Sequence, residues 1–257
     1  MLWGLRHNAE ALRDSPVAID FVAFMGEESG QWGSREFGRR HAADYEFAIV
    51  GEPTDLDIVH VTKGSLWATL RTAGKATHSS QPEKGDNAVM KMARALGPLE
   101  DQLRIRLAGF THPILGHSTL NIGLIRGGSR PNVVPDRCEA EIDIRTTPSL
   151  NEAGGVLEIL KEALEDTPLE LVNPHDNPPM ETVADHPWIG RIRAVRPASK
   201  PAGAPWFSDA AHLSTAGIPS VCIGPGSIHQ AHTADEFIEI AALEKGAEFF
   251  SAFIASV

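Results

Sequence analysis

The sequence predicts an α/β protein in which a mostly parallel sheet carries a smaller inserted α+β domain. Two nearly continuous apolar runs, at residues 17–25 and 47–50, are typical of strands buried on both faces of a parallel sheet. From residue 63 the pattern changes to alternating apolar and polar residues, which is typical of strands with one buried face. We therefore expect the parallel-sheet domain at residues 1–62 and 174–257, and the inserted domain at 63–173.

The composition is that of a globular chain able to bury a core. Its 257 residues are 42% apolar and 22% charged. An excess of 34 acidic over 23 basic residues gives a net charge of −11, which argues against a nucleic-acid-binding face. The two cysteines, Cys138 and Cys222, lie in predicted strands, so we expect reduced, buried thiols and a cytoplasmic protein. No apolar run reaches the ~18 residues that span a bilayer, so no membrane partner is expected.

The first part of the parallel-sheet domain places carboxylates after its strands. Its expected elements are an amphipathic helix at 1–14, a strand at 17–25, a helix at 33–42 and a strand at 47–50. Glu27 and Glu28 follow the first strand, and Glu52 follows the second. Ligands of open α/β sheets bind outside the carboxyl ends of the strands, so these carboxylates lie where a site is expected.

The inserted domain has the element order β-α-β-β-α-β. The expected strands are 65–72, 118–125, 138–145 and 169–172, and the expected helices are 87–99 and 150–165. The first helix carries Val89, Met92, Ala93 and Leu96 at the spacing of one helical face. This order with one-sided strands predicts a ferredoxin-like split β-α-β layer.

The parallel-sheet domain resumes after a polar, proline-rich stretch at 173–180. We expect a helix at 187–196, a short buried strand at 218–223 and a closing helix at 240–254. The short strand leads directly into the glycine-rich loop that begins at Gly224.

Three Gly/Pro-rich loops carry residue types that bind divalent metals. They hold the pair Glu27 and Glu28, then Glu52, and finally His232. Adjacent carboxylates can divide the work, one binding a metal while the other acts as a general base. Each also has a plainer interpretation, as an acidic helix N-terminus, a turn glutamate or a solvated histidine. Taken together, the three loops suggest a metallohydrolase.

Three residues of the inserted domain are further candidates, each with two interpretations. His78 is either a turn residue or a hydrogen-bond donor to a developing oxyanion. Asn132 is either a turn residue or an amide donor to a substrate. Arg145 either forms an ion pair with acidic neighbours on a solvated sheet face or binds a substrate carboxylate with its guanidinium fork.

In this order the segments resemble the di-zinc family of acetylornithine deacetylase, succinyl-diaminopimelate desuccinylase and carboxypeptidase G. The resemblance covers essentially the whole chain and implies a zinc-peptidase-like catalytic domain with a ferredoxin-like lid and dimerisation domain. It implies that Glu27 is the general base. It also implies that Glu28, Glu52 and His232 are ligands of divalent metal ions, two zinc ions in the family.

The resemblance also assigns substrate contacts. It implies that His78, Asn132 and Arg145 contact the scissile carbonyl and the terminal carboxylate, partly from the neighbouring subunit of a homodimer. The loops of Ser208 and Gly224 resemble those that shape the substrate site. The activity implied is metal-dependent hydrolysis of the amide bond of an N-acyl amino acid or short peptide.

The chain departs from the family before the paired glutamates. The family's His-x-Asp segment and bridging Asp have no counterpart, and the match begins inside a later helix near Met1. We therefore expect an N-terminally truncated chain with an incomplete catalytic domain, an incomplete metal site and impaired activity. The alternative is a non-catalytic fragment that dimerises or binds a ligand.

Overall fold

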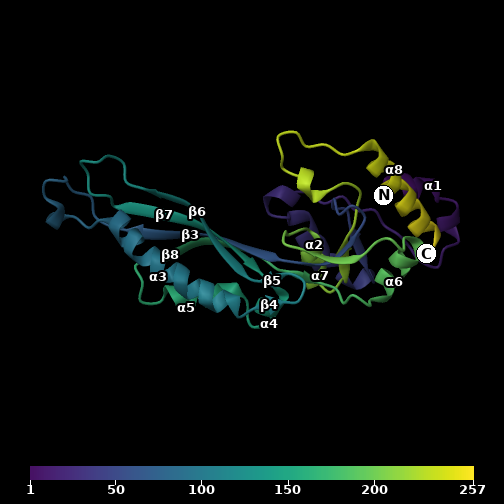
Figure 1. Cartoon of the computed structure of the whole chain (residues 1–257), viewed down its shortest axis with the longest axis horizontal. Helices are drawn as coiled ribbons and strands as arrows, with labels where there is room; N and C mark the ends of the chain where they lie inside the picture. The colour runs from purple at the N-terminus through teal and green to yellow at the C-terminus, as the bar shows by residue number, and fades with distance from the viewer. The chain divides into compact units, whose positions relative to one another are not determined.

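Two units make up the structure, a computed structural model that describes residues 1–257 (Figure 1). Unit 1 contains Met1–Thr62, Met180–Ala204 and Ser208–Val257, and unit 2 contains Lys63–Pro179 and Pro205–Phe207. The expected boundary after residue 173 therefore falls too early. The strand β8 (Glu170–Asn177) runs through it, because pairing with β3 resumes beyond a bulge and continues to Asn177.

Unit 1 is built on a short mixed sheet. Its strands are β1 (Ala48–Val50), β11 (Ser220–Cys222), β2 (Ile58–Thr62) and β10 (Pro201–Ala204), in that spatial order, with β9 (Met180–Glu181) also paired to β2. The pairs β1–β11 and β2–β10 are parallel, whereas β2 meets β11 and β9 in antiparallel orientation. The buried residues of β2 and β11 join those of α6 and α8 in one apolar core, which includes Ile58, Val221, Ile192 and Phe250.

The helices of unit 1 are α1 (Leu2–His7), α2 (Trp32–His41), α6 (Pro187–Val195), α7 (Ala210–Thr215) and α8 (Ile240–Ala255). Three of them (α2, α6 and α8) match the expected helices to within one residue at each end, and α7 was not predicted. The helix expected over 1–14 is shorter and is followed by a 3-10 turn at Ala11–Arg13. None of the helices in the structure combines the length and apolar character that a bilayer crossing requires.

The buried strand expected at residues 17–25 does not form. These residues have no strand partner, and Phe21 and Val22 are 43% and 39% exposed. A cavity of about 460 Å³ is lined by this segment and by β1, which is the terminal strand of the sheet. An apolar run becomes a strand only where a neighbouring backbone completes its hydrogen-bond ladder, and residues 17–25 are paired with no strand of the sheet.

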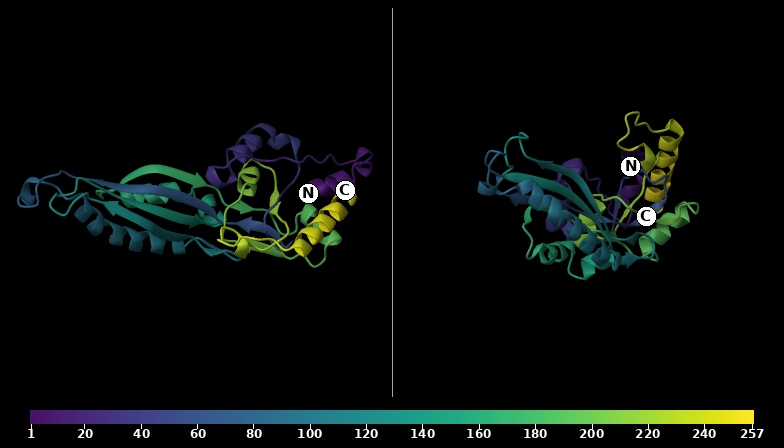
Figure 2. Two further views of the ribbon diagram at one scale, coloured as in Figure 1. Left: turned by 90° about the horizontal axis from the view of Figure 1, so that it is seen from above. Right: turned by 60° about the vertical axis from the view of Figure 1, so that its left-hand side comes forward.

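Unit 2 has the predicted ferredoxin-like layer. Its antiparallel sheet has the order β6 (Thr119–Gly127), β7 (Arg137–Thr146), β3 (Gly64–Ala73) and β8. The helices α3 (Ala88–Ala108) and α5 (Val156–Leu164) cover one face of the sheet (Figure 1 and Figure 2). The expected helix at 150–165 is divided, because the positive φ angles of Gly154 and Gly155 separate α4 (Pro148–Glu152) from α5.

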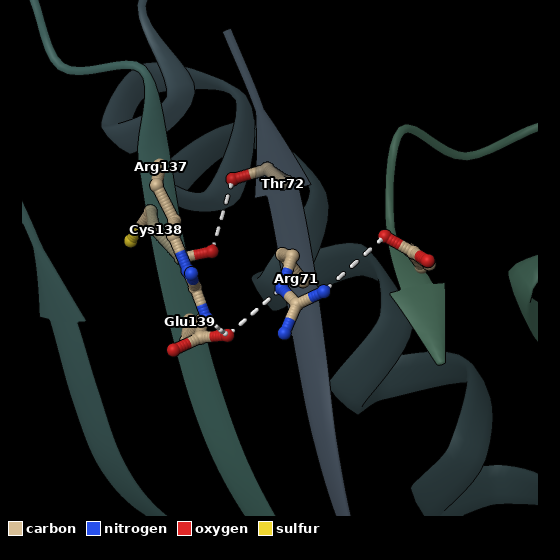
Figure 3. A network of polar contacts seen from close by, with 6 residues as sticks. Arg71, Thr72, Arg137, Cys138 and Glu139 are labelled. Atoms are coloured by element: carbon tan, nitrogen blue, oxygen red, sulfur yellow. Dashed lines mark hydrogen bonds and ion pairs between the residues drawn. The ribbon is translucent and has the colours of Figure 1, made fainter. Parts of the chain in front are cut away.

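The two faces of this sheet differ as the alternation predicts. Leu66, Ala68 and Leu70 of β3 point into the core and pack against α3. On the other face Glu139 Oε1 accepts hydrogen bonds from Arg71 Nε at 2.8 Å and Arg137 at 2.7 Å, as Figure 3 shows. A two-stranded hairpin of β4 (Thr111–His112) and β5 (Gly116–His117) completes the unit.

Candidate active site

The loop that carries Glu27 and Glu28 is a tight turn at the start of α2. Gly26 adopts a φ of 76°, and its carbonyl accepts hydrogen bonds from the N–H groups of Ser29 and Gln31 at 3.0 and 2.7 Å. These bonds close a 3-10 turn over Glu27–Ser29. The turn therefore presents two consecutive carboxylates from one short, hydrogen-bonded segment.

Glu52 is held by a loop that is hydrogen-bonded to the Gly224 loop. The N–H groups of Thr54 and Leu56 donate to the carbonyl of Gly224 at 3.2 and 3.0 Å. A Cβ added to Gly224 would lie 2.5 Å from the Glu52 carbonyl oxygen, so only glycine allows this approach. The structure thus explains why Gly224 is needed, namely to place the backbone of Glu52.

His232 lies opposite Glu28. Its Nε2 is 3.9 Å from Glu28 Oε1, and both side chains are 75% exposed. The residue has a φ of 60°, and its N–H donates to Glu236 Oε2 at 3.0 Å. The structure therefore brings together two of the three predicted metal ligands.

Asp209 is a site residue that the sequence analysis missed. It precedes α7, is only 4% exposed, and accepts a hydrogen bond of 2.5 Å from Ser34 Oγ. The sequence held a signal, because Asp209 follows Ser208 in a loop already expected to shape the site. Ser208 itself is completely buried, and its hydroxyl lies 3.1 Å from Cys222 Sγ.

Glu27, Glu28, Glu52 and Asp209, together called the acidic cluster, interact electrostatically. The pKa of Glu52 is raised to about 7, first by burial and then by the charges of the other three carboxylates. Burial, Glu28 and Asp209 likewise raise the pKa of Glu27, while His232 acts in the opposite direction. No lysine or arginine forms an ion pair with any of the four. His232 is therefore the one basic side chain that forms an ion pair with the cluster.

The chemistry of this donor set fits a divalent cation. Carboxylate and imidazole are zinc ligands, and a cation would offset the burial and the carboxylate repulsion that raise the pKa values of Glu27 and Glu52. The side chains do not form a complete metal-coordination site, since no three His, Cys, Asp or Glu groups converge on one point. Mutual repulsion of like charges acts against such convergence.

In unit 2 the structure brings His78 and Asn132 together. The N–H of Ser79 donates to the Asn132 carbonyl at 3.0 Å, and His78 forms a bridge with Val133. The N–H of Ser80 donates to His78 Nδ1 at 3.2 Å. In a neutral imidazole the proton then lies on Nε2, which remains available as a donor.

Arg145 lies at the other end of the same sheet. The turn of His78 and Asn132 adjoins the Ala73–Arg137 pair, eight residues along β7 from Arg145. At about 3.3 Å per residue these ends are about 26 Å apart. Both Nε and a terminal nitrogen of Arg145 donate to Asp143 Oδ2, at 3.2 and 2.9 Å.

Known proteins resemble this chain along most of its length. Residues 61–171 match the family model of the peptidase dimerisation domain of the M20 group. An acetylornithine deacetylase from Proteus mirabilis is 32% identical over 266 residues, covering 95% of this chain. The chain belongs to the M20 peptidase family. It spans 66% of the length of this relative, and 63% of a Salmonella typhimurium acetylornithine deacetylase to which it is 33% identical.

Solved structures of this M20 family share the fold. An aminopeptidase from Bacillus cereus superposes with a TM-score of 0.71 at 22% identity, over 98% of this chain and 68% of its own. A metallo-carboxypeptidase from Sulfolobus solfataricus gives a TM-score of 0.69 at 18% identity, over 89% and 68%. These likenesses confirm the predicted fold class.

Proposed function

We propose that this M20 chain serves the metal-dependent hydrolysis of amide bonds in N-acyl amino acids or short peptides. The observation that carries the proposal is the acidic cluster, which gathers four carboxylates near His232 without a lysine or arginine to balance them. A divalent cation of the zinc type satisfies this arrangement. Glu28, Glu52 and His232 would hold it.

In the proposed reaction the cation and Glu27 have separate roles. When bound, the cation supplies polarisation of the scissile carbonyl and a water of lowered pKa. Glu27 accepts a proton from the attacking water and delivers it to the nitrogen of the leaving amine. The raised pKa of Glu27 suits this role, because a general base works best when its pKa approaches the working pH.

The lid unit would supply the remaining substrate contacts from two copies of the chain. His78 Nε2 and the Asn132 amide are donors for the carbonyl oxygen, and the Arg145 fork suits a carboxylate. Because Arg145 lies at the opposite end of the sheet, one small substrate cannot reach both ends within one chain. A homodimer formed through unit 2 resolves this, and the match to a dimerisation domain supports it.

The substrate class rests on this carboxylate binding and on the relatives. Arg145 would exchange its ion pair with Asp143 for the substrate carboxylate, while Ser208 and Gly224 shape the pocket through their loops. The relatives are acetylornithine deacetylases, a name that describes such an N-acyl amino acid substrate. A cytoplasmic location fits the two free, buried cysteines.

The decisive experiment compares the chain with its Glu27→Gln variant. We expect zinc-dependent hydrolysis of N-acetyl amino acids to fall by about 10²–10⁴-fold in kcat, because the general base is lost. Zinc binding should persist, at no more than one ion per chain, since Glu28, Glu52 and His232 are retained. Rates and metal content are measured on the same purified protein.

Two results would decide against this assignment. Near-wild-type kcat in Glu27→Gln would remove Glu27 from the mechanism. Zinc binding without any hydrolysis by the wild-type chain would favour the alternative of a non-catalytic, dimerising or ligand-binding protein.

A further inference from the structure

A cavity lies on the face of the unit 2 sheet opposite the helices α3 and α5, which cover the other face (Figure 1). Its volume is about 430 Å³, and its lining includes Trp67, Leu124, Glu141, Asp143 and His175. We call this cavity the Trp67 pocket. All of these residues belong to unit 2, and none of them is a proposed metal ligand.

Two irregularities in strand pairing flank the Trp67 pocket. On β6 the register with β7 shifts between Ile122 and Leu124, and on β8 the register with β3 shifts opposite the step from Trp67 to Thr69. The irregular part of β8 contains Asn173, whose φ is 49°. Bulges bend a strand and increase its local twist, so both edge strands of the sheet curve at the level of Trp67. The hollow is therefore built into the backbone.

Trp67 is an exposed indole among polar neighbours. It is 55% exposed and stands in register with Asp143 on β7 and His175 on β8. Residues directly opposite one another on a sheet face have Cβ atoms about 4.5–5.5 Å apart, so both polar side chains adjoin the indole. Trp67 stacks on no other ring of the chain. Packing within the sheet therefore does not account for so large an apolar side chain at this position.

Glu141 brings an unbalanced negative charge to the same pocket. It lies on one face of β7 between Glu139 and Asp143, each of which is paired with arginine. Glu141 itself forms no ion pair and no side-chain hydrogen bond, and no lysine or arginine lines the pocket. It is the diagonal cross-strand neighbour of Trp67, a separation of about 7–8 Å that long and aromatic side chains bridge.

The lining of the pocket also includes a hydrogen-bond acceptor without a donor. Asp143 uses Oδ2 for both hydrogen bonds from Arg145, while its Oδ1 is buried and has no partner. A buried carboxylate oxygen that lacks a donor costs free energy. An indole, an unpaired carboxylate and an acceptor without a donor are together complementary to a ligand with positive charge and N–H groups.

We propose that the Trp67 pocket binds a small organic cation that carries N–H donors on an alkyl chain, such as an alkylammonium. The Glu141 carboxylate and the Trp67 indole hold its charge, and Asp143 Oδ1 accepts from its N–H groups. Leu124 contacts its alkyl part. This inference does not rest on the proposed function, because binding requires neither a metal ion nor hydrolysis.

The test is a saturation-transfer NMR titration of the full chain with n-butylammonium chloride, in EDTA and at constant ionic strength. We expect a Kd on the order of millimolar, as for other ligands with few heavy atoms. The neutral analogue n-butanol should bind at least about tenfold more weakly, because it lacks the charge that the carboxylate and the indole attract.

Three variants locate the site, with circular dichroism to show that each is folded. Trp67→Leu keeps an apolar side chain but loses the indole, and Glu141→Gln loses the charge. Each should raise the Kd by about 3-fold to 30-fold, the range that corresponds to one cation–π contact. Glu152→Gln neutralises an exposed glutamate of α4 in the same unit and should leave the Kd unchanged.

Four results would overturn the proposal. Equal binding of n-butanol and n-butylammonium would show that the pocket selects apolar volume rather than charge. An unchanged Kd in Trp67→Leu or in Glu141→Gln would place the cation elsewhere. An equal loss of affinity in Glu152→Gln would assign the attraction to the net charge of −11. A wild-type chain without detectable transfer to n-butylammonium would show that no such site exists.

Discussion

Glu52 shows at the residue scale how the fold alters a common side chain. In sequence it is a glutamate between a strand and a proline, with nothing to distinguish it from a turn residue. In the structure its backbone is set by Gly224 and its carboxyl is half-buried among three others, which raises its pKa to about 7. The position of a carboxylate among like charges, rather than its identity, makes it a metal ligand candidate.

This shift predicts a pH-dependent stability. The folded chain binds the Glu52 proton with a pKa of about 7 and the unfolded chain with the ordinary value of 4.5. Folded protein therefore holds more protons in this window, and the free energy of unfolding should fall as the pH rises from 4.5 to 7. The effect is at most about 3 kcal/mol. Urea unfolding in EDTA across this pH range measures it.

Two variants test whether the pH dependence of stability comes from the Glu52 carboxyl. Glu52→Gln should flatten the pH dependence and stabilise the metal-free chain at alkaline pH. Glu248→Gln removes an exposed glutamate of the same unit and should leave the profile unchanged. Identical profiles for wild type and Glu52→Gln would show that the carboxyl is not perturbed in solution.

At the element scale, α3 illustrates how local sequence fixes a helix start. Asn87 is its N-cap, and the Asn87 side-chain oxygen accepts a hydrogen bond from the Met90 N–H at 3.0 Å. From there Met92, Leu96 and Leu103 follow one face and are buried against the sheet. The cap and the helical spacing are both readable in sequence, and the helix was predicted to begin within a residue of its position.

We predict that Asn87→Ala lowers the free energy of unfolding by about 1 kcal/mol, because an orphan N–H of the first turn loses its acceptor. Chemical denaturation monitored by circular dichroism measures the difference. Asn87→Ser should retain most of the stability, and Gln102→Ala on the exposed side of the same helix serves as the matched control. No loss in Asn87→Ala would mean that packing alone fixes the start of α3.

At the scale of the whole molecule, the two units have separate cores. The core of unit 2 contains only residues between Leu66 and Leu169, and that of unit 1 draws on residues outside this range. Separate cores are what allow a domain to fold independently. The dimerisation-domain match falls on the unit that contains the independent sheet.

We therefore predict that residues 63–179 fold alone and associate as a homodimer. Circular dichroism with cooperative thermal unfolding tests the first part, and sedimentation of this segment and of the full chain tests the second. An unfolded segment would contradict the independence of unit 2. A full chain that stays monomeric at micromolar concentration would contradict a substrate site completed by two copies.

The sequence by itself determined those helices and strands whose hydrophobic pattern can be recognised within the segment itself. Alternation in β3 and β7 predicted the two faces of the unit 2 sheet, because side-chain period reports burial directly. Helical spacing predicted the start of α3 but not its end, since the helix expected over 87–99 continues through Pro98 to Ala108. The paired glutamates, Glu52 and His232 were predicted as site residues only from the order of their three loops along the chain, because each residue alone is also typical of an ordinary turn.

Only the tertiary structure decided strand pairing and the grouping of site residues, because both depend on segments that are distant in sequence. Residues 17–25 have the composition of a buried strand but pair with no strand of the sheet, and Phe21 and Val22 stay partly exposed. Asp209 joins Glu27 and Glu52 only through folding, and the separation of Arg145 from His78 follows from the register of β3 with β7. A residue pattern encodes how much of a segment is buried, whereas the packed chain fixes which groups it is buried against.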